Sequence, residues 1–102
     1  MTFIAMNRFR IAKGREAEFE EIWATRESNL PGMAGFVSFK LLRGPSGDDH
    51  TLFASHVVWE SRQHFEDWTR SEAFRKSHGG TARSAGLYLG PPHFEGFEVV
   101  LE

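Results

Sequence analysis

The sequence contains no cysteine in its 102 residues. Disulfide bonds, thiol chemistry and thiolate metal sites are therefore excluded. Basic residues are not in excess, because 12 Lys and Arg face 14 Asp and Glu, and this balance argues against nucleic acid as a partner. No stretch approaches the roughly 18 apolar residues of a membrane span, and no signal peptide opens the chain. We therefore expect a soluble, cytoplasmic protein without a membrane partner.

Aromatic side chains, in contrast, are plentiful: the chain has ten Phe, three Trp and one Tyr. Its length fits a single domain, which we place over residues 1–102. A domain of this size buries roughly two-thirds of the surface of its unfolded chain, so its interior is modest. We therefore expect some of the rings to line a pocket or an interface between subunits.

Two hydrophobic patterns follow one another along the chain: an alternation with period two, typical of strands, and a period of about 3.6, typical of amphipathic helices. Strands are predicted over residues 2–11, 35–43, 51–59 and 94–101. Helices are predicted over residues 15–29, 62–70 and 72–78. The resulting order β-α-β-β-α-β predicts an α+β fold of the ferredoxin-like, split β-α-β type. In this fold a four-stranded antiparallel sheet carries helices on one face.

Capping and turn residues set the limits of these elements. Ser61 and Ser71 are candidate N-caps, and Ser71 predicts the break between the two short helices. The Pro-Gly pair at 31–32 ends the first helix, and the segment 44–49 predicts a hairpin turn. Residues 79–92 hold four Gly and two Pro without periodicity, which predicts a long loop of the kind that often forms a lid or binds a ligand.

Both faces of the predicted sheet carry apolar side chains. In the first strand, Ile4 and Met6 lie opposite the face that contains Phe3 and Phe9, and the third strand is apolar on both of its faces. Such a sheet needs a cover on its second face, and another copy of the same chain is the simplest one. The pattern therefore predicts a homodimer built by packing sheet against sheet.

Three residues stand out against these patterns. Asn7 lies in the middle of a strand, on an otherwise apolar face, where an amide without a partner costs about 1–3 kcal/mol. Trp68 shares a helix stripe with Phe65, and His78 closes the second short helix beside two glycines. Each has a structural explanation by itself: a hydrogen bond to a neighbouring loop, a place in the core, and a helix C-cap, respectively.

Together the three residues indicate a binding site. The chain turns at the predicted break, so Trp68 and His78 can face one cavity between the helices and the sheet, with Asn7 on the sheet side. Arg26 on the first helix adds a cation at the rim of this cavity. An aromatic wall, an imidazole, an amide and nearby cations suit a flat, largely apolar ligand that carries carboxylates and a metal, namely heme.

The sequence also resembles a known family over nearly its whole length. The stretches that carry the resemblance are MNRF at 6–9, PGMAGFVSFKLLR at 31–43 and VWESRQHFEDWTRSEAFRKSH at 58–78. They are similar to the antibiotic biosynthesis monooxygenase (ABM) superfamily of dimeric α+β barrels, and within it to the IsdG-type heme-degrading monooxygenases. The combination of Asn7, Trp68 and His78 resembles the Asn-Trp-His triad of those heme degraders, whereas the loop 79–92 departs from their pattern.

The resemblance implies a role for each site residue. His78 is implied as the axial ligand of the heme iron, Trp68 as the residue that distorts the porphyrin, and Asn7 as a hydrogen-bond donor to the oxygen that the reaction activates. Arg26 is implied near a heme propionate. Heme is then substrate and cofactor together, with O2 as the oxidant. Because the sequence has no flavin or nicotinamide motif, the electrons come from an external donor or reductase.

Two other functions remain open at the level of the sequence. The first is a cofactor-independent ABM oxygenase of an aromatic polyketide, which uses the same cavity and needs no histidine at its centre. The second is a non-enzymatic heme carrier, which binds heme and leaves it intact. We favour the heme-degrading monooxygenase because Asn7, Trp68 and His78 occur together.

Overall fold

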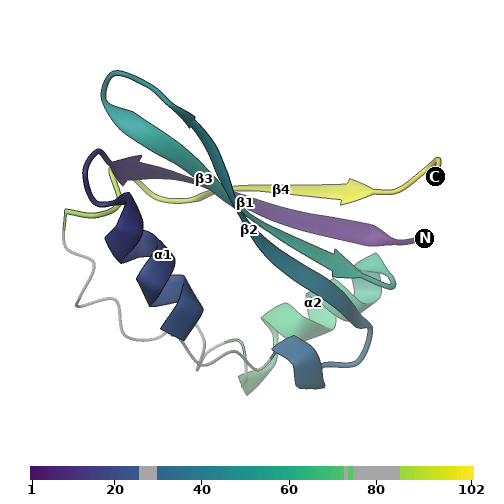
Figure 1. The fold of residues 1–102 in the computed structure, drawn as a ribbon. Coiled ribbons are helices and arrows are strands. Elements are labelled where there is room, and N and C mark those ends of the chain that lie inside the picture. The colour runs from purple at the N-terminus through teal and green to yellow at the C-terminus, as the bar shows by residue number, and fades with distance from the viewer. Residues whose placement is uncertain (26–29, 73, 75–85) are drawn as a thin grey trace.

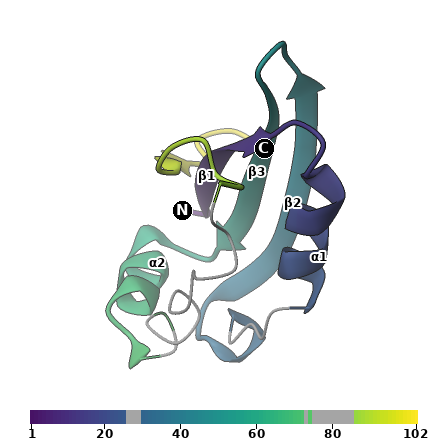
Figure 2. The ribbon, with the colours of Figure 1, turned by 90° about the vertical axis from the view of Figure 1, so that its left-hand side faces the viewer.

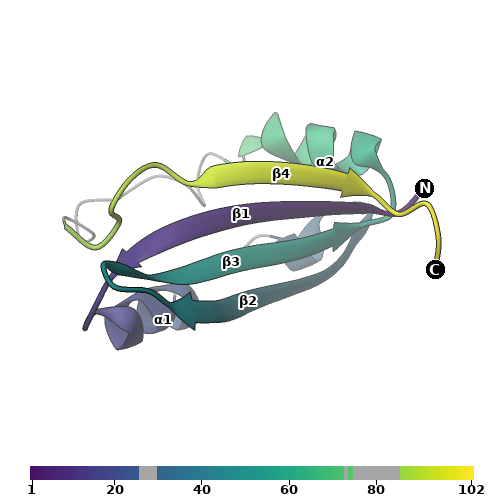
Figure 3. The same ribbon diagram turned by 90° about the horizontal axis from the view of Figure 1, so that it is seen from above.

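The computed structural model describes residues 1–25, 30–72, 74 and 86–102. Its four strands are β1 (Phe3–Ala12), β2 (Phe36–Ser46), β3 (His50–Trp59) and β4 (His93–Glu98). They form one antiparallel sheet in the order β2-β3-β1-β4, and Figure 3 shows them side by side. The helices α1 (Glu16–Thr25) and α2 (Arg62–Thr69) cover the same face of this sheet (Figure 1). The predicted ferredoxin-like α+β fold is therefore confirmed.

β2 is longer than the sequence predicts. A turn is expected over 44–49, but the strand continues to Ser46 after a register shift that follows Arg43. Pro45 lies at this irregularity on an edge strand, and both circumstances tolerate a residue without an amide N–H. The turn is correspondingly tight, and Gly47 donates its backbone N–H across it at 2.8 Å.

The first predicted helix is confirmed over the part of its range that the structure describes. α1 accounts for Glu16–Thr25 of the predicted range 15–29, and residues 26–29 lie outside the described residues. Leu30–Gly32 form a 3-10 turn, η1, in which Pro31 has no amide N–H to donate. None of the helices in the described ranges is long and apolar enough to cross a membrane.

The caps of the second helical segment agree with the sequence. The Ser61 hydroxyl accepts a hydrogen bond from the His64 amide at 3.2 Å, which makes Ser61 the N-cap of α2. α2 ends before Ser71, whose Oγ accepts from the Phe74 amide at 3.1 Å. The predicted break is therefore confirmed, while most of the predicted helix 72–78 lies outside the described residues.

The segments around β4 differ from their predictions. The strand predicted over 94–101 begins at His93 and ends at Glu98, and directly after it the Val99 amide donates to the Thr2 carbonyl at 2.8 Å. The loop predicted over 79–92 is described from residue 86 onward. There it is anchored to β1: Leu87 is fully buried and its carbonyl accepts the Ala12 amide at 2.9 Å. This end of the loop therefore extends the core and is not a lid.

The helix-covered face holds two separate hydrophobic clusters. The α1 cluster consists of Phe9, Ile11, Phe19, Phe53 and Leu87. The α2 cluster consists of Phe3, Ala5, Trp59 and Trp68. Phe19 of α1 and Trp68 of α2 are both buried, so each helix directs an aromatic side chain toward the sheet. Figures 1 and 2 show that the two helices lie apart, so each covers its own end of the sheet.

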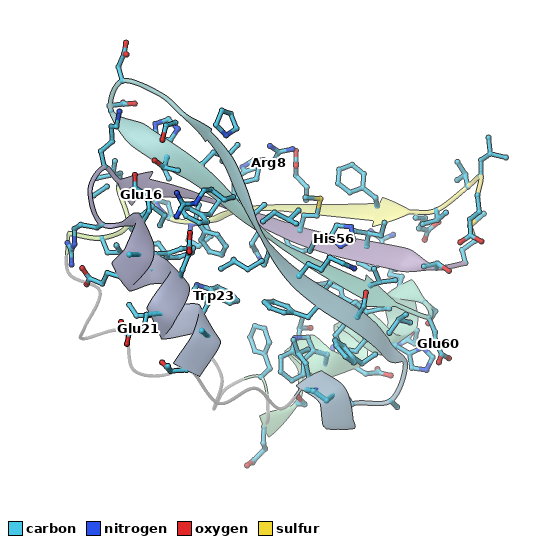
Figure 4. All side chains as sticks on the ribbon, viewed as in Figure 1. Arg8, Glu16, Glu21, Trp23, His56 and Glu60 are labelled. Carbon is cyan, nitrogen blue, oxygen red and sulfur yellow. The ribbon has the colours of Figure 1, made fainter. Side chains whose placement is uncertain are left out.

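The other face of the sheet, which we call the open face, has no helix over it in the part of the chain that the structure describes (Figure 3). Leu42 and Phe97 on this face are 39% and 47% exposed. Arg8, which Figure 4 shows on the side away from the helices, pairs with Glu95 at 2.7 Å and holds the pKa of that carboxyl below its ordinary value. His56 has a buried Nδ1 without a partner among the described residues. The open face is thus less uniformly apolar than the sequence suggests.

A buried hydroxyl joins the start of α1 to β3. Thr51 is 1% exposed, and its Oγ1 donates to Glu16 Oε2 at 2.7 Å and lies 2.7 Å from the Ser46 hydroxyl. Glu16 also accepts a hydrogen bond from the Gly14 amide at 3.0 Å. The hydrogen bond from Thr51 holds the pKa of Glu16 below its ordinary value. This network anchors α1 at the end of the sheet that carries the α1 cluster, and Figure 4 shows the position of Glu16 at the start of α1.

Replacing Thr51 with valine is expected to lower the melting temperature by about 4–8 °C, because a domain of this size loses one buried hydrogen bond. Since folding depresses the pKa of Glu16, its contribution is present at neutral pH and is lost as the pH falls through that pKa. The difference between the two proteins should therefore shrink below about pH 4. Circular dichroism during heating measures it, and an equal difference in acid and at neutral pH would contradict the role of Glu16.

Candidate functional site

One row of side chains separates the two hydrophobic clusters. We call it the central row, and the strand register places its members opposite one another on the four strands: Leu41, Ser55, Asn7 and Phe94. The row faces the helices, because Asn7 alternates along β1 with Ala5 and Phe9, which are buried there. The predicted position of Asn7, in the middle of β1 and on the strand face that it shares with Phe3, Ala5, Phe9 and Ile11, is confirmed.

The side-chain amide of Asn7 forms no hydrogen bond with any residue that the structure describes. Its side chain is only partly buried, and an amide offers two N–H donors and one carbonyl acceptor. The structural explanation that the sequence leaves open, a hydrogen bond to a neighbouring loop, has no counterpart in the described ranges. The amide is therefore available to a ligand that reaches the helix-covered face.

Trp68 lies in the α2 cluster, beside the central row. Its ring is 6% exposed and packs against Trp59 and Phe74, with centroid distances of 6.2 and 5.5 Å. Ala5 of the same cluster precedes Asn7 by two residues on the same face of β1. The structure thus brings Trp68 and Asn7 to one side of the sheet, as the sequence predicts, and holds the Trp68 ring between aromatic neighbours.

Two stacked aromatic pairs lie near the central row. On the β2 side, Trp23 of α1 and Phe39 stack with centroids 5.7 Å apart and planes 9° apart. On the β4 side, Phe65 of α2 and Phe94 stack at 5.4 Å and 8°. Phe39 and Phe94 remain 37% and 46% exposed, so flat apolar surface is present at both edges of this face. These rings have the exposure expected of residues that line a pocket.

Arg26 and His78, the other two predicted site residues, lie outside the described residues. The four other histidines all lie away from the central row: His50, His56, His64 and His93. The first and third are within hydrogen-bond distance of Asp49 and Ser61, at 2.7 and 2.8 Å. Within the described ranges, no histidine therefore lies in the central row with Asn7.

Ser55 is a residue that the sequence does not single out, although the register places it directly opposite Asn7. Ser55 is 4% exposed. The buried Thr51 hydroxyl donates a hydrogen bond to Glu16, whereas the Ser55 hydroxyl forms no hydrogen bond within the described part of the chain. The sequence does contain a signal for its position, because Ser55 lies two residues from both Phe53 and Val57 and therefore on the same face of the strand. Only the strand register, however, reveals that it faces Asn7.

Neutral side chains make up the centre of the face. The strand register places no ionisable side chain in the central row or in the neighbouring row through Ala5. No three His, Cys, Asp or Glu side chains among the described residues gather into a site for a bare metal ion. A surface hollow of about 350 Å³ lies elsewhere, on α1, and is lined by Glu18, Glu21, Ile22 and Thr25. The described part of the site thus offers aromatic surface and neutral hydrogen-bonding groups.

A family model described as "Antibiotic biosynthesis monooxygenase" matches residues 2–80. The chain belongs to this family, and the family resemblance that the sequence indicates is confirmed. A heme oxygenase (mycobilin-producing) of Mycobacterium tuberculosis is 30% identical over 102 residues, which are 100% of this chain and 92% of that protein. A heme oxygenase (staphylobilin-producing) of Staphylococcus aureus is 31% identical over 80 residues, which are 76% of this chain and 72% of that protein.

The fold is also similar to that of a solved structure. The heme-degrader MhuD from Mycobacterium tuberculosis, solved with two hemes bound in its active site, superposes with a TM-score of 0.77. The alignment covers 98% of this chain and 97% of that chain at 27% identity. The similarity therefore extends over the whole fold, including both helices and all four strands.

Proposed function

We propose that this monooxygenase degrades heme: it binds heme through His78, opens the porphyrin ring with O2 and external electrons, and releases the iron. The observation that carries the proposal is the side-chain amide of Asn7, which is partly exposed, has no partner among the described residues and lies between the two hydrophobic clusters. The relatives from Mycobacterium tuberculosis and Staphylococcus aureus, both named as heme oxygenases, support heme as the substrate.

The described residues suit heme in three respects. The exposed rings of Phe39 and Phe94 offer flat apolar contact, which a porphyrin requires. Trp68 is held by its aromatic neighbours, so the small part of it that is exposed, 6%, can contact a porphyrin without moving away. Asn7 offers N–H donors at the centre of the face. Heme itself supplies the iron and the carbon that is oxidised, so the protein has to bind, orient and hydrogen bond.

His78 and Arg26 complete the proposed site. A neutral imidazole is an ordinary axial ligand of heme iron, and His78 follows the confirmed break at Ser71 by a few residues. Arg26 follows α1 directly and would pair its guanidinium with a heme propionate. An external donor or reductase supplies the electrons, because the sequence contains no flavin or nicotinamide motif.

Hemin tests the proposal and separates it from the two alternatives. The purified protein is expected to shift the Soret band of hemin, and the shifted band should then bleach when a reductant is added in air, with iron captured by a ferrous chelator. A cofactor-independent oxygenase would leave the Soret band of hemin unshifted. A heme carrier would shift the band and preserve it under reductant, so either result would contradict heme degradation.

We also propose that the chain forms a homodimer in which two open faces pack together. The open face carries exposed apolar side chains at Leu42 and Phe97, and no described helix covers it. The buried Nδ1 of His56 has no hydrogen-bond partner in the described residues. A second surface that supplies a hydrogen-bond partner would stabilise such an atom. A second copy supplies both an apolar cover and new polar groups.

The proposed dimer predicts different effects for substitutions at two phenylalanines of β4, because the two lie on opposite faces of the sheet. Phe97→Glu should dissociate the dimer, because Phe97 lies on the open face and a carboxylate would be buried there. Phe94→Glu is the matched control, since Phe94 is almost equally exposed, 46% against 47%, but faces the helices. Analytical ultracentrifugation should give about twice 11.6 kDa for the wild type and for Phe94→Glu. A wild-type species of 11.6 kDa would contradict the dimer.

A further inference from the structure

We propose that Ser55 is a positioning residue for Asn7: when substrate binds, the Ser55 hydroxyl donates a hydrogen bond to the Asn7 carbonyl oxygen Oδ1, a bond that the structure itself does not contain, and so directs the amide NH2 toward the substrate. The inference rests on the proposed function, because it concerns the same site. It starts from two polar side chains that share one row and form no hydrogen bond with any residue the structure describes.

The register brings the two side chains within reach of each other. Asn7 of β1 and Ser55 of β3 are direct cross-strand partners, and both project from the helix-covered face. Cβ atoms of such partners lie about 4.5–5.5 Å apart. An amide and a hydroxyl that extend from Cβ atoms at this spacing can form a hydrogen bond of about 2.7–3.0 Å after a rotation of the amide.

Burial indicates which of the two residues meets the substrate. Ser55 is 4% exposed, whereas the Asn7 side chain is only partly buried. The serine hydroxyl is also one bond from its Cβ, while the amide nitrogen is two bonds away, so the amide extends further from the sheet. A substrate that arrives from the helix side therefore meets the Asn7 amide first. Ser55 acts through Asn7 and does not touch the substrate.

The chemistry of the neighbours selects the orientation of the amide. The other members of the central row, Leu41 and Phe94, have no polar side-chain atom, so Ser55 is the neighbour in this row that can hydrogen bond to Asn7. An oxygen atom of the substrate complex can only accept from the amide NH2. The Asn7 carbonyl is then left for a donor, and the Ser55 hydroxyl is the donor beside it. This arrangement satisfies both residues.

Kinetics of heme loss test the inference through a double-mutant cycle. Ser55→Ala is expected to lower kcat by about 2- to 13-fold, the factor that corresponds to one neutral hydrogen bond, without a change in KM. Ser55→Thr keeps the hydroxyl and should restore kcat. In the Asn7→Ala background, Ser55→Ala should have no further effect, because the residue that it positions is gone.

Nuclear magnetic resonance provides a readout besides activity. The side-chain NH2 signals of Asn7, assigned by their loss in Asn7→Ala, are recorded for the complex with gallium protoporphyrin IX, which is diamagnetic and is not degraded. Ser55→Ala should shift these signals and Ser55→Thr should leave them near their wild-type positions. Thr51→Val is the control, because it removes another buried hydroxyl of β3 from the same face and should not move them.

The outcomes separate this inference from the proposed function. Wild-type protein that neither binds nor consumes hemin would overturn both. Wild-type turnover of hemin with an equal effect of Ser55→Ala in the presence and absence of Asn7 would overturn the positioning role alone, as would unshifted Asn7 signals. If Ser55→Ala fails to fold, Ser55→Cys keeps the volume and weakens the donor, and it should reproduce the loss of kcat.

Discussion

Replacing His78 with alanine is expected to remove axial ligation of the heme iron and to weaken hemin binding by more than about 100-fold, since even the outer partners of metal ligands are worth 10–100-fold. Turnover should then fall below detection. The reason is that the other histidines lie away from the central row, and two of them already have partners at Asp49 and Ser61. Titration with hemin, followed at the Soret band, measures the loss.

Matched controls make this result specific. Alanine substitutions at the four remaining histidines should leave the Soret spectrum of the hemin complex unchanged: His50, His56, His64 and His93. His78→Gly with added imidazole should recover the spectrum, because free imidazole can occupy the space of the lost ring. If one of the four controls abolished ligation and His78→Ala did not, the proposed axial ligand would be wrong.

Asn7→Ala should bind hemin almost as tightly as the wild type and degrade it about 10²–10³-fold more slowly, which is the effect of removing one donor aimed at developing negative charge. An amide is a weak ligand for iron, so its loss should lower the rate of heme degradation and leave the affinity for hemin nearly unchanged. Single-turnover measurements of heme loss at saturating reductant, together with hemin titration, separate the two quantities.

The isosteric variant Asn7→Asp sharpens the test. An ionised aspartate keeps the shape of the side chain but has no N–H to donate. Its turnover should therefore be as slow as that of Asn7→Ala, although its volume is that of the wild type. Turnover at the wild-type rate in either variant would show that the amide has only a structural role, despite its lack of a partner among the described residues.

Local patterns were sufficient to predict the elements that position the site. The alternation around Asn7 placed it on the helix-covered face, and the helix stripe that Trp68 shares with Phe65 placed Trp68 against the sheet. These features depend on neighbours within a strand or a helix turn, which the sequence records directly. His78 and Arg26 entered as candidates through charge, position and family resemblance, and they lie outside the described residues.

The features that the sequence did not reveal depend on contacts between distant segments. The proposed role of Ser55 depends on the pairing of β1 with β3, which places it beside Asn7. A serine in a strand has no distinctive sequence pattern that would reveal this position. Pro45 and its glycine neighbour indicated a turn, but the edge position and irregular register of β2 allow the strand to continue through them. The division of the core into two clusters is likewise a property of the assembled sheet.

That division has a consequence for the lifetime of the protein in the cell. A ligand that fills the space over the central row would touch both clusters and tie the two ends of the sheet together. Such a ligand binds only the native state, so at about 100 times its dissociation constant it adds roughly 2.7 kcal/mol to the free energy of unfolding. Proteases attack the transiently opened chain, so a loaded protein would outlive an empty one. Substrate supply would in this way regulate the abundance of the enzyme as well as its turnover.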